Sequence, residues 1–175
     1  MVLVGSNRLV NSDPKEVDNM IILDKIAAEA AQGIIGLEGM MLKDTKTVLS
    51  KDIDKLATNA LGVLQEQGVY ACLLYLLSKS GSENEQNKFR ADEYVACGII
   101  SHLINLFNHP EIKLLGLAYE GELEPTSINQ EKNKLLKHCS ENIAGDLSSL
   151  LLVKSVFEQT LIYTRYGAKA HVGKS

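Results

Sequence analysis

Two pairs of neighbouring acidic residues are the side chains in this sequence best suited to proton transfer. Asp52 and Asp54 form one pair, and Asp92 and Glu93 form the other. General acid and base catalysis uses such carboxylates, but both pairs stand where a helix is expected to begin, and acids there cap free amides and complement the helix dipole. No G-x-S-x-G nucleophile motif is present. We therefore predict helix-start roles for both pairs and a protein that is not an enzyme.

Histidines and a glycine-rich stretch offer two further kinds of chemistry. His102, His109, His138 and Cys139 are of metal-binding types, but they lack the compact local pairs, such as C-x-x-C, that zinc sites use. The stretch GIIGLEG, residues 33–39, has the small residues of a phosphate loop, but it lacks a preceding strand and the G-x-G-x-x-G pattern. We predict a helix there that packs closely and frays, and we predict no metal site and no cofactor.

Basic residues beside tyrosines indicate a different role, contact with nucleic acid. Arg165 and Lys169 lie near the C-terminal end together with Tyr163 and Tyr166. This combination holds phosphates and stacks on bases in single-stranded RNA, and the alternative is a solvated helix end. A second basic group flanks a polar stretch: Lys79, Lys88 and Arg90. The net charge of −4 and the pI of about 5.6 argue against tight nucleic-acid binding by the chain alone.

The spacing of apolar residues predicts the helices that must position these side chains. Apolar residues recur every three or four positions, which is the period of a helix buried along one face. The expected helices cover residues 14–42, 50–79, 90–108, 126–145 and 146–168, and a sixth, short helix is an alternative within the connection 109–127. The predicted fold class is therefore all-α, a compact bundle of five to six helices.

Length and composition fit one domain with a single core. The chain has 175 residues, of which 45% are hydrophobic and 23% charged. We expect a flexible N-terminal arm (1–13), one helical-bundle domain (14–168) and a C-terminal tail (169–175). Three cysteines with apolar neighbours indicate free buried thiols. We also expect no signal peptide and no membrane span, which together with the thiols predicts a cytoplasmic protein.

The segment QGVYACLLYLLSK, residues 67–79, is apolar on every side after its glycine. We interpret it as a helix that is packed all round and forms the centre of the bundle. Gly68 costs up to about 1 kcal/mol relative to Ala inside a helix. We expect another helix backbone to approach closely at this glycine, because no side chain stands in the way.

Two parts of the chain resemble the small subunit of the type III-B (Cmr) CRISPR effector complex. The first is the segment just described, where the matching residues are Gly68, Tyr75, Leu76, Leu77, Ser78 and Lys79. Gln67 replaces the Asn of the family pattern. The second is LLLVKSVFEQTLIYTRYGAKA, where the matching residues are Arg165, Tyr166, Gly167 and Ala168 and the usual Trp is missing. A weaker match in the first helix places Lys25 beside Ala27 and Ala28.

The resemblance implies a non-catalytic subunit of a ribonucleoprotein in antiviral defence. Such subunits stack beside the backbone subunits and contact target RNA paired to the guide RNA, so it also implies other complex subunits as partners and self-association along the filament. We expect Lys25, Lys79, Arg165 and Lys169 to be the RNA-binding residues. Three alternatives stay open: the small subunit of a related type III complex, a helical protein-interaction module with no RNA role, and an enzyme with an unrecognised site.

Overall fold

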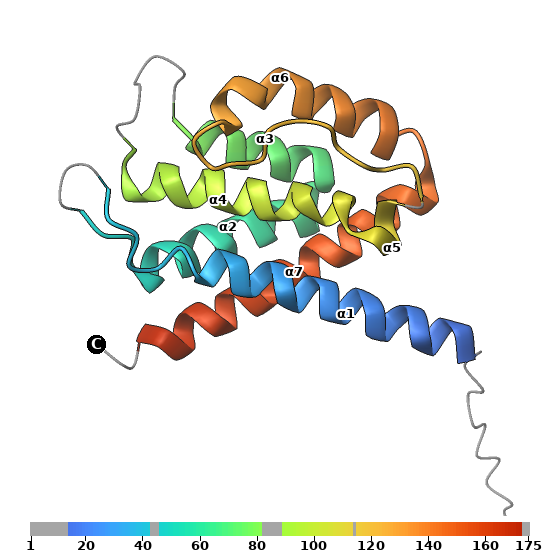
Figure 1. Cartoon of the computed structure of the whole chain (residues 1–175), viewed down its shortest axis with the longest axis horizontal. Coiled ribbons are helices and arrows are strands. Elements are labelled where there is room, and N and C mark those ends of the chain that lie inside the picture. The colour runs from blue at the N-terminus through green and yellow to red at the C-terminus, as the bar shows by residue number, and fades with distance from the viewer. Residues whose placement is uncertain (1–13, 43–45, 82–88, 114, 173–175) are drawn as a thin grey trace, which may run out of the picture.

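The computed structural model describes residues 14–42, 46–81, 89–113 and 115–172, so the predicted arm 1–13 lies outside the described residues. The predicted all-α bundle is confirmed (Figure 1). Its helices are α1 (Pro14–Ile35), α2 (Ser50–Gln67), α3 (Val69–Lys79), α4 (Ala91–Asn105), α5 (Pro110–Lys113), α6 (Ile128–His138) and α7 (Leu147–Val172). A 3-10 turn, Leu106–Asn108, follows α4, and a π-helical turn, Cys139–Ile143, follows α6. Within these ranges no strand forms, although Met41 and Thr47 make an isolated bridge.

The centre of the bundle is α4. Residues 95–101 of this helix are all buried, as are Leu103 and Ile104. It packs against α1, α2, α3 and α6, and Figure 1 shows it running through the middle of the molecule. The helix α4 is apolar around its whole circumference because it contacts neighbouring helices on several sides.

The helix α3 lies at the surface, so the prediction that it is the packed centre is wrong. One face is buried through Val69, Cys72, Leu73, Leu76 and Leu77. The opposite face leaves Tyr70 and Leu74 exposed to 41% and 43%. Apolar composition alone does not distinguish a central helix from one with an exposed apolar face.

Gly68 ends α2 and separates it from α3, instead of lying inside one helix from 50 to 79. Its φ of 91° and ψ of −175° belong to a region that is essentially restricted to glycine. A Cβ added to Gly68 would meet nothing within 4 Å, so the predicted close approach of another backbone is also wrong. The glycine is needed for its backbone conformation, which lets the chain change direction between two helices.

The long helix α7 packs against both α1 and α2. A Cβ at Gly167 would collide with Ile35 of α1, and a Cβ at Gly33 would collide with the ring of His102, so both glycines permit close helix contacts. The helix α1 ends at Ile35, before the predicted residue 42, because the chain turns through residues 36–39 and Gly39 has a φ of 79°. The helix α7 continues to Val172, so the first four residues of the expected tail, 169–172, are helical.

The three cysteines are free and buried, as predicted. Burial raises the pKa of Cys72 and Cys97 to about 12 and that of Cys139 to about 11. A thiol reacts through its thiolate form, which is scarce at neutral pH when the pKa is this high. The cysteines therefore serve as small core residues.

Candidate nucleic-acid interface

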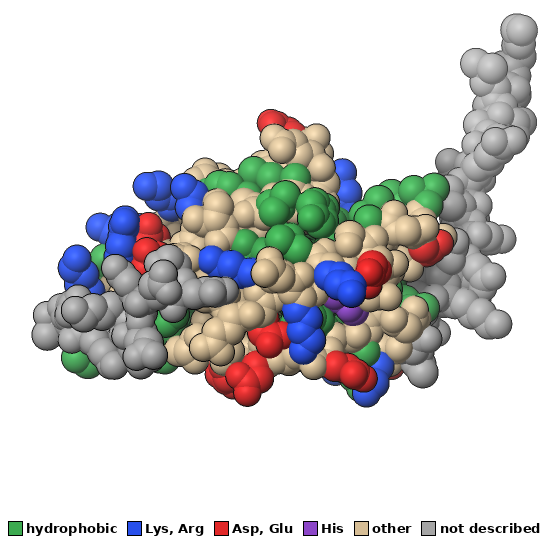
Figure 2. Space-filling model, turned by 90° about the horizontal axis from the view of Figure 1, so that it is seen from above, with side chains coloured by type: hydrophobic (Ala, Val, Ile, Leu, Met, Phe, Trp, Pro, Cys, Tyr) green, Lys and Arg blue, Asp and Glu red, His purple; other side chains and the backbone are tan. Residues whose placement is uncertain are grey.

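A basic cleft of about 430 Å³ lies where the first turns of α2, the last turns of α3 and the first turn of α4 come together. Four cationic residues line it: Lys46, Lys55, Lys79 and Arg90. Two acidic residues, Asp52 and Asp92, also line it, so the cleft has an excess of two positive charges. Figure 2 shows a group of Lys and Arg side chains at one end of the molecule with acidic side chains beside it, further basic side chains across the same face, and apolar side chains nearer the middle.

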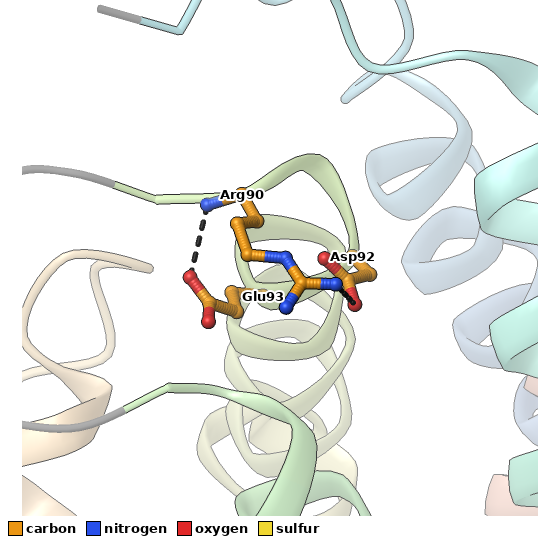
Figure 3. A network of polar contacts seen from close by, with 3 residues as sticks. All are labelled: Arg90, Asp92 and Glu93. Carbon is orange, nitrogen blue, oxygen red and sulfur yellow. Dashed lines mark hydrogen bonds and ion pairs between the residues drawn. The ribbon is translucent and has the colours of Figure 1, made fainter.

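The acidic residues around the cleft are already engaged in local structure. Asp52 Oδ2 accepts a hydrogen bond from the backbone N–H of Leu49 (3.2 Å), and Glu93 Oε2 accepts one from the N–H of Arg90 (2.9 Å). The guanidinium of Arg90 pairs with Asp92 at 3.2 Å (Figure 3). Asp52 and Glu93 thus have the predicted roles at helix starts.

The lysines of the cleft are not neutralised by the part of the chain that the structure describes. Lys46, Lys55 and Lys79 form no ion pair with any described residue. The Lys79 ammonium lies 5.7 Å from the centre of the Tyr75 ring, a weak cation–π contact. All three lysines are exposed, so their ammonium groups are accessible to a phosphate group.

A buried polar network fixes the end of α3 and with it the position of Lys79. Ser80 Oγ donates a hydrogen bond to Asn129 Oδ1 (2.8 Å), and Asn129 Nδ2 donates one to the carbonyl oxygen of Ser80 (2.8 Å). Lys132 Nζ donates to the carbonyl oxygen of Gly81 at 2.6 Å. Buried amides with both hydrogen-bonding ends satisfied hold their partners in one geometry. The helix α6 therefore anchors one wall of the cleft.

The four residues predicted to bind RNA do not form one cluster. Lys79 lines the cleft. Arg165 and Lys169 lie near the end of α7, and Arg165 Nε is 4.0 Å from Asp54 Oδ1 of α2. Figure 1 places this end of α7 at the same end of the molecule as the cleft-forming ends of α2, α3 and α4. Lys169 is exposed there, whereas Arg165 is partly covered.

Lys25 lies on a different surface from the cleft. It pairs with Glu29 of its own helix at 3.8 Å. The neighbouring Asp24 accepts a hydrogen bond from Tyr163, so Tyr163 is on the side of α7 that faces α1. Arg165 lies two residues further along α7 and is on the side that faces α2. Positions two apart on a helix point about 200° apart. The structure therefore does not bring Lys25 to the side of α7 that carries Arg165.

Sequence reasoning missed two residues of the cleft, Lys46 and Lys55. Lys55 lies on the polar side of an amphipathic helix, where a lysine usually signals only solvent exposure. Lys46 lies in the connection between the first two predicted helices, outside the basic groups that stand beside tyrosines or flank the polar loop. Of the other basic residues singled out, Arg90 does line the cleft, whereas Lys88 falls outside the described residues.

The histidines considered as metal ligands are spread over two smaller hollows. His102 and His109 border one of about 240 Å³, and His138 borders another of about 290 Å³. Burial lowers the pKa of His102, which keeps its ring neutral at pH 7. Within the described ranges, no three His, Cys, Asp or Glu side chains come together as metal ligands would.

Glu38 connects the turn after α1 to the ends of α2 and α7. Its carboxylate accepts a hydrogen bond from Ser50 Oγ, and Oε2 lies 2.7 Å from Nδ1 of His171. The Ser50 and His171 contacts hold the pKa of Glu38 below its ordinary value of 4.5. The folded state thus binds this proton less readily than the unfolded state. The ionised Glu38 carboxylate therefore stabilises the folded state at pH values above 4.5. This stabilisation is lost as the pH falls through the lowered pKa of the folded state.

We expect Glu38→Gln to make the free energy of unfolding less dependent on pH in the acidic range. The protein should be more stable than the variant near pH 6, and the difference should shrink as the pH falls below the ordinary carboxyl pKa and the carboxylate takes up its proton. Urea unfolding at a series of pH values measures this. Glu66→Gln, at an exposed position on α2, is the control, and an equal pH response in both variants would contradict the assignment.

Comparisons with known proteins identify no relative. No protein-family model, no curated protein and no solved structure matches the chain. Among the described residues, none of the helices combines the length and hydropathy needed to span a membrane.

Proposed function

We propose that this protein is a non-catalytic helical subunit that binds RNA phosphate groups through its basic cleft as part of a larger assembly. The observation that carries the proposal is the convergence of Lys46, Lys55, Lys79 and Arg90 on one cleft of an otherwise acidic chain. The resemblance to the small subunit of the type III-B CRISPR effector complex suggests the kind of assembly, in which the RNA is a target strand paired to a guide. A cytoplasmic location is part of the same proposal.

The charge distribution favours RNA binding inside an assembly over binding by the isolated chain. A net charge of −4 repels RNA from most of the surface, and three exposed acids lie in one segment: Glu120, Glu122 and Glu124. A partner that holds the protein beside RNA makes the remaining phosphate contacts intramolecular, which raises their effective concentration to the millimolar range. A few lysine contacts then add useful affinity.

Charge reversal in the cleft tests this proposal. We expect Lys55→Glu with Lys79→Glu to weaken binding of a single-stranded RNA by the full chain. The dependence of log K on log salt should become shallower by about 0.7 for each phosphate group that the variant no longer neutralises. Lys113→Glu with Lys137→Glu is the matched control, because it makes the same change in net charge at exposed lysines that do not line the cleft. Equal effects of the two double variants would contradict the proposal.

A second candidate function is a protein-interaction module with no RNA role. It is favoured by exposed apolar side chains on two helices, Tyr70 and Leu74 on α3 and Leu147 and Leu151 on α7. Purification of the native assembly followed by nuclease treatment separates the two functions. Short RNA fragments that copurify and disappear on digestion support the RNA-binding subunit, whereas an RNA-free assembly supports the interaction module.

A further inference from the structure

We propose that the basic cleft binds a single nucleotide that carries two or more phosphate groups, supplied either as a free nucleoside triphosphate or as the 5′-triphosphate end of an RNA strand. This inference rests on the proposed function to the extent that both place phosphate groups against the same lysines. It goes beyond that function because it assigns the cleft to one nucleotide rather than to the repeating backbone of a strand.

The size of the cleft fits one nucleotide. Its volume of about 430 Å³ lies in the lower part of the range of small-molecule sites, roughly 300–1,000 Å³. A duplex carries its phosphates on its convex outer surface, so it can touch the rim of a cleft but cannot fill it. A free nucleotide or a strand end has no such restriction.

The charge in the cleft fits a polyphosphate better than a single backbone phosphate. Each phosphate within a strand carries one negative charge. The cleft holds three lysines that form no ion pair with described residues, and the guanidinium of Arg90 shares its charge with Asp92. Asp52 also lines the cleft, so its net excess is two positive charges, and a ligand with several negative charges close together matches this excess better than one backbone phosphate does. Lysine suits this role because it binds phosphate as a mobile point charge.

The remaining wall of the cleft can accommodate a base. Leu56, Tyr75 and Ala91 supply apolar surface, and the side-chain amide of Asn59 offers both donors and an acceptor. Small-ligand sites combine apolar surface of this kind with polar groups that fix the orientation of the ligand. Asn59 is exposed on α2 one turn after Lys55, so a base beside Asn59 would leave the phosphates near the lysines.

The first experiment titrates the full chain with ATP, GTP and inorganic tripolyphosphate by calorimetry. We expect ATP or GTP to bind, and we expect Lys55→Glu with Lys79→Glu to weaken that binding by about 10- to 100-fold, since each tenfold loss corresponds to 1.4 kcal/mol. Lys113→Glu with Lys137→Glu should bind as the unaltered protein does. Lys55→Gln with Lys79→Gln provides a milder variant if charge reversal impairs folding. Tripolyphosphate should compete with the nucleotide if the phosphates supply the affinity.

The second experiment compares one short RNA sequence with a 5′-hydroxyl, a 5′-monophosphate or a 5′-triphosphate. A preference for the triphosphate that the cleft variant abolishes identifies the strand end as the ligand. Nucleotide binding without such a preference identifies the free nucleotide. If the protein shows no nucleotide binding and no preference for the 5′-triphosphate, while RNA binding still depends on the cleft lysines, this inference is overturned and the proposed function survives. Cleft-dependent nucleotide binding by the full chain, together with a native assembly that copurifies without RNA, would overturn the proposed function and leave the nucleotide site standing.

Discussion

Replacing Phe157 with alanine is expected to lower the free energy of unfolding by about 3–5 kcal/mol. The Phe157 ring is fully buried in α7 and stacks on Phe107, with ring centroids 5.7 Å apart. Its removal leaves a cavity between α7 and the turn after α4 that the surrounding helices fill only partly. The cost is a large share of the roughly 5–15 kcal/mol that stabilises a typical domain. Guanidinium unfolding followed by circular dichroism measures it.

Tyr166 provides the control on the same helix. Its side chain is 70% exposed, so Tyr166→Ala should change the free energy of unfolding by no more than about 0.5 kcal/mol. Both substitutions truncate an aromatic residue of α7 to the same methyl group, and burial is the main difference between them. Similar destabilisation of the two variants would show that the core between α7 and Phe107 is not packed as described.

Two glycine-to-alanine substitutions are expected to have opposite effects. Gly68→Ala should destabilise the protein by about 1–3 kcal/mol, because the φ of 91° and ψ of −175° at this position are strained for any residue with a side chain. Gly62→Ala should stabilise it by about 0.4–1 kcal/mol, because Gly62 lies inside α2 and a Cβ there meets nothing within 4 Å.

Thermal or urea unfolding of the two variants distinguishes a break at Gly68 from a continuous helix. If α2 and α3 formed one helix, alanine would be favoured over glycine at both positions. Stabilisation by Gly68→Ala would therefore contradict the break. The break also matters for the cleft, because it allows α3 to fold back beside α2 so that Lys79 and Lys55 line the same space.

The cleft combines rigid walls with exposed charge. The hydrogen bonds of Ser80 with Asn129 fix the end of α3, and the Glu93 contact with the Arg90 amide fixes the start of α4. The lysines between them are exposed on long side chains. This arrangement presents exposed positive charge at a fixed place on the surface. It is consistent with a subunit whose proposed contribution is binding.

Local sequence patterns were sufficient to predict the helices and many of the residues at which they begin or end. The period of apolar residues predicted the all-α bundle because a helix must bury one face whatever its partners are. Pro14 begins α1, and Pro110 follows the 3-10 turn at the end of the third predicted helix. The acids at helix starts were correctly interpreted for Asp52, Asp92 and Glu93, which lie in the first turns of α2 and α4. Asp54 lies beyond the first turn of α2 and pairs with Arg165 of α7 instead.

Only the tertiary structure decided which helix is central and which lysines meet. The apolar residues of α3 and α4 look alike in sequence, yet α4 is enclosed by four helices and α3 leaves Tyr70 and Leu74 exposed. Lys46, Lys55, Lys79 and Arg90 come from different parts of the chain and share a cleft because Gly68 turns α3 back towards α2. Helix periodicity is a property of neighbouring residues. The choice of packing partners depends on the whole core, which no local pattern contains.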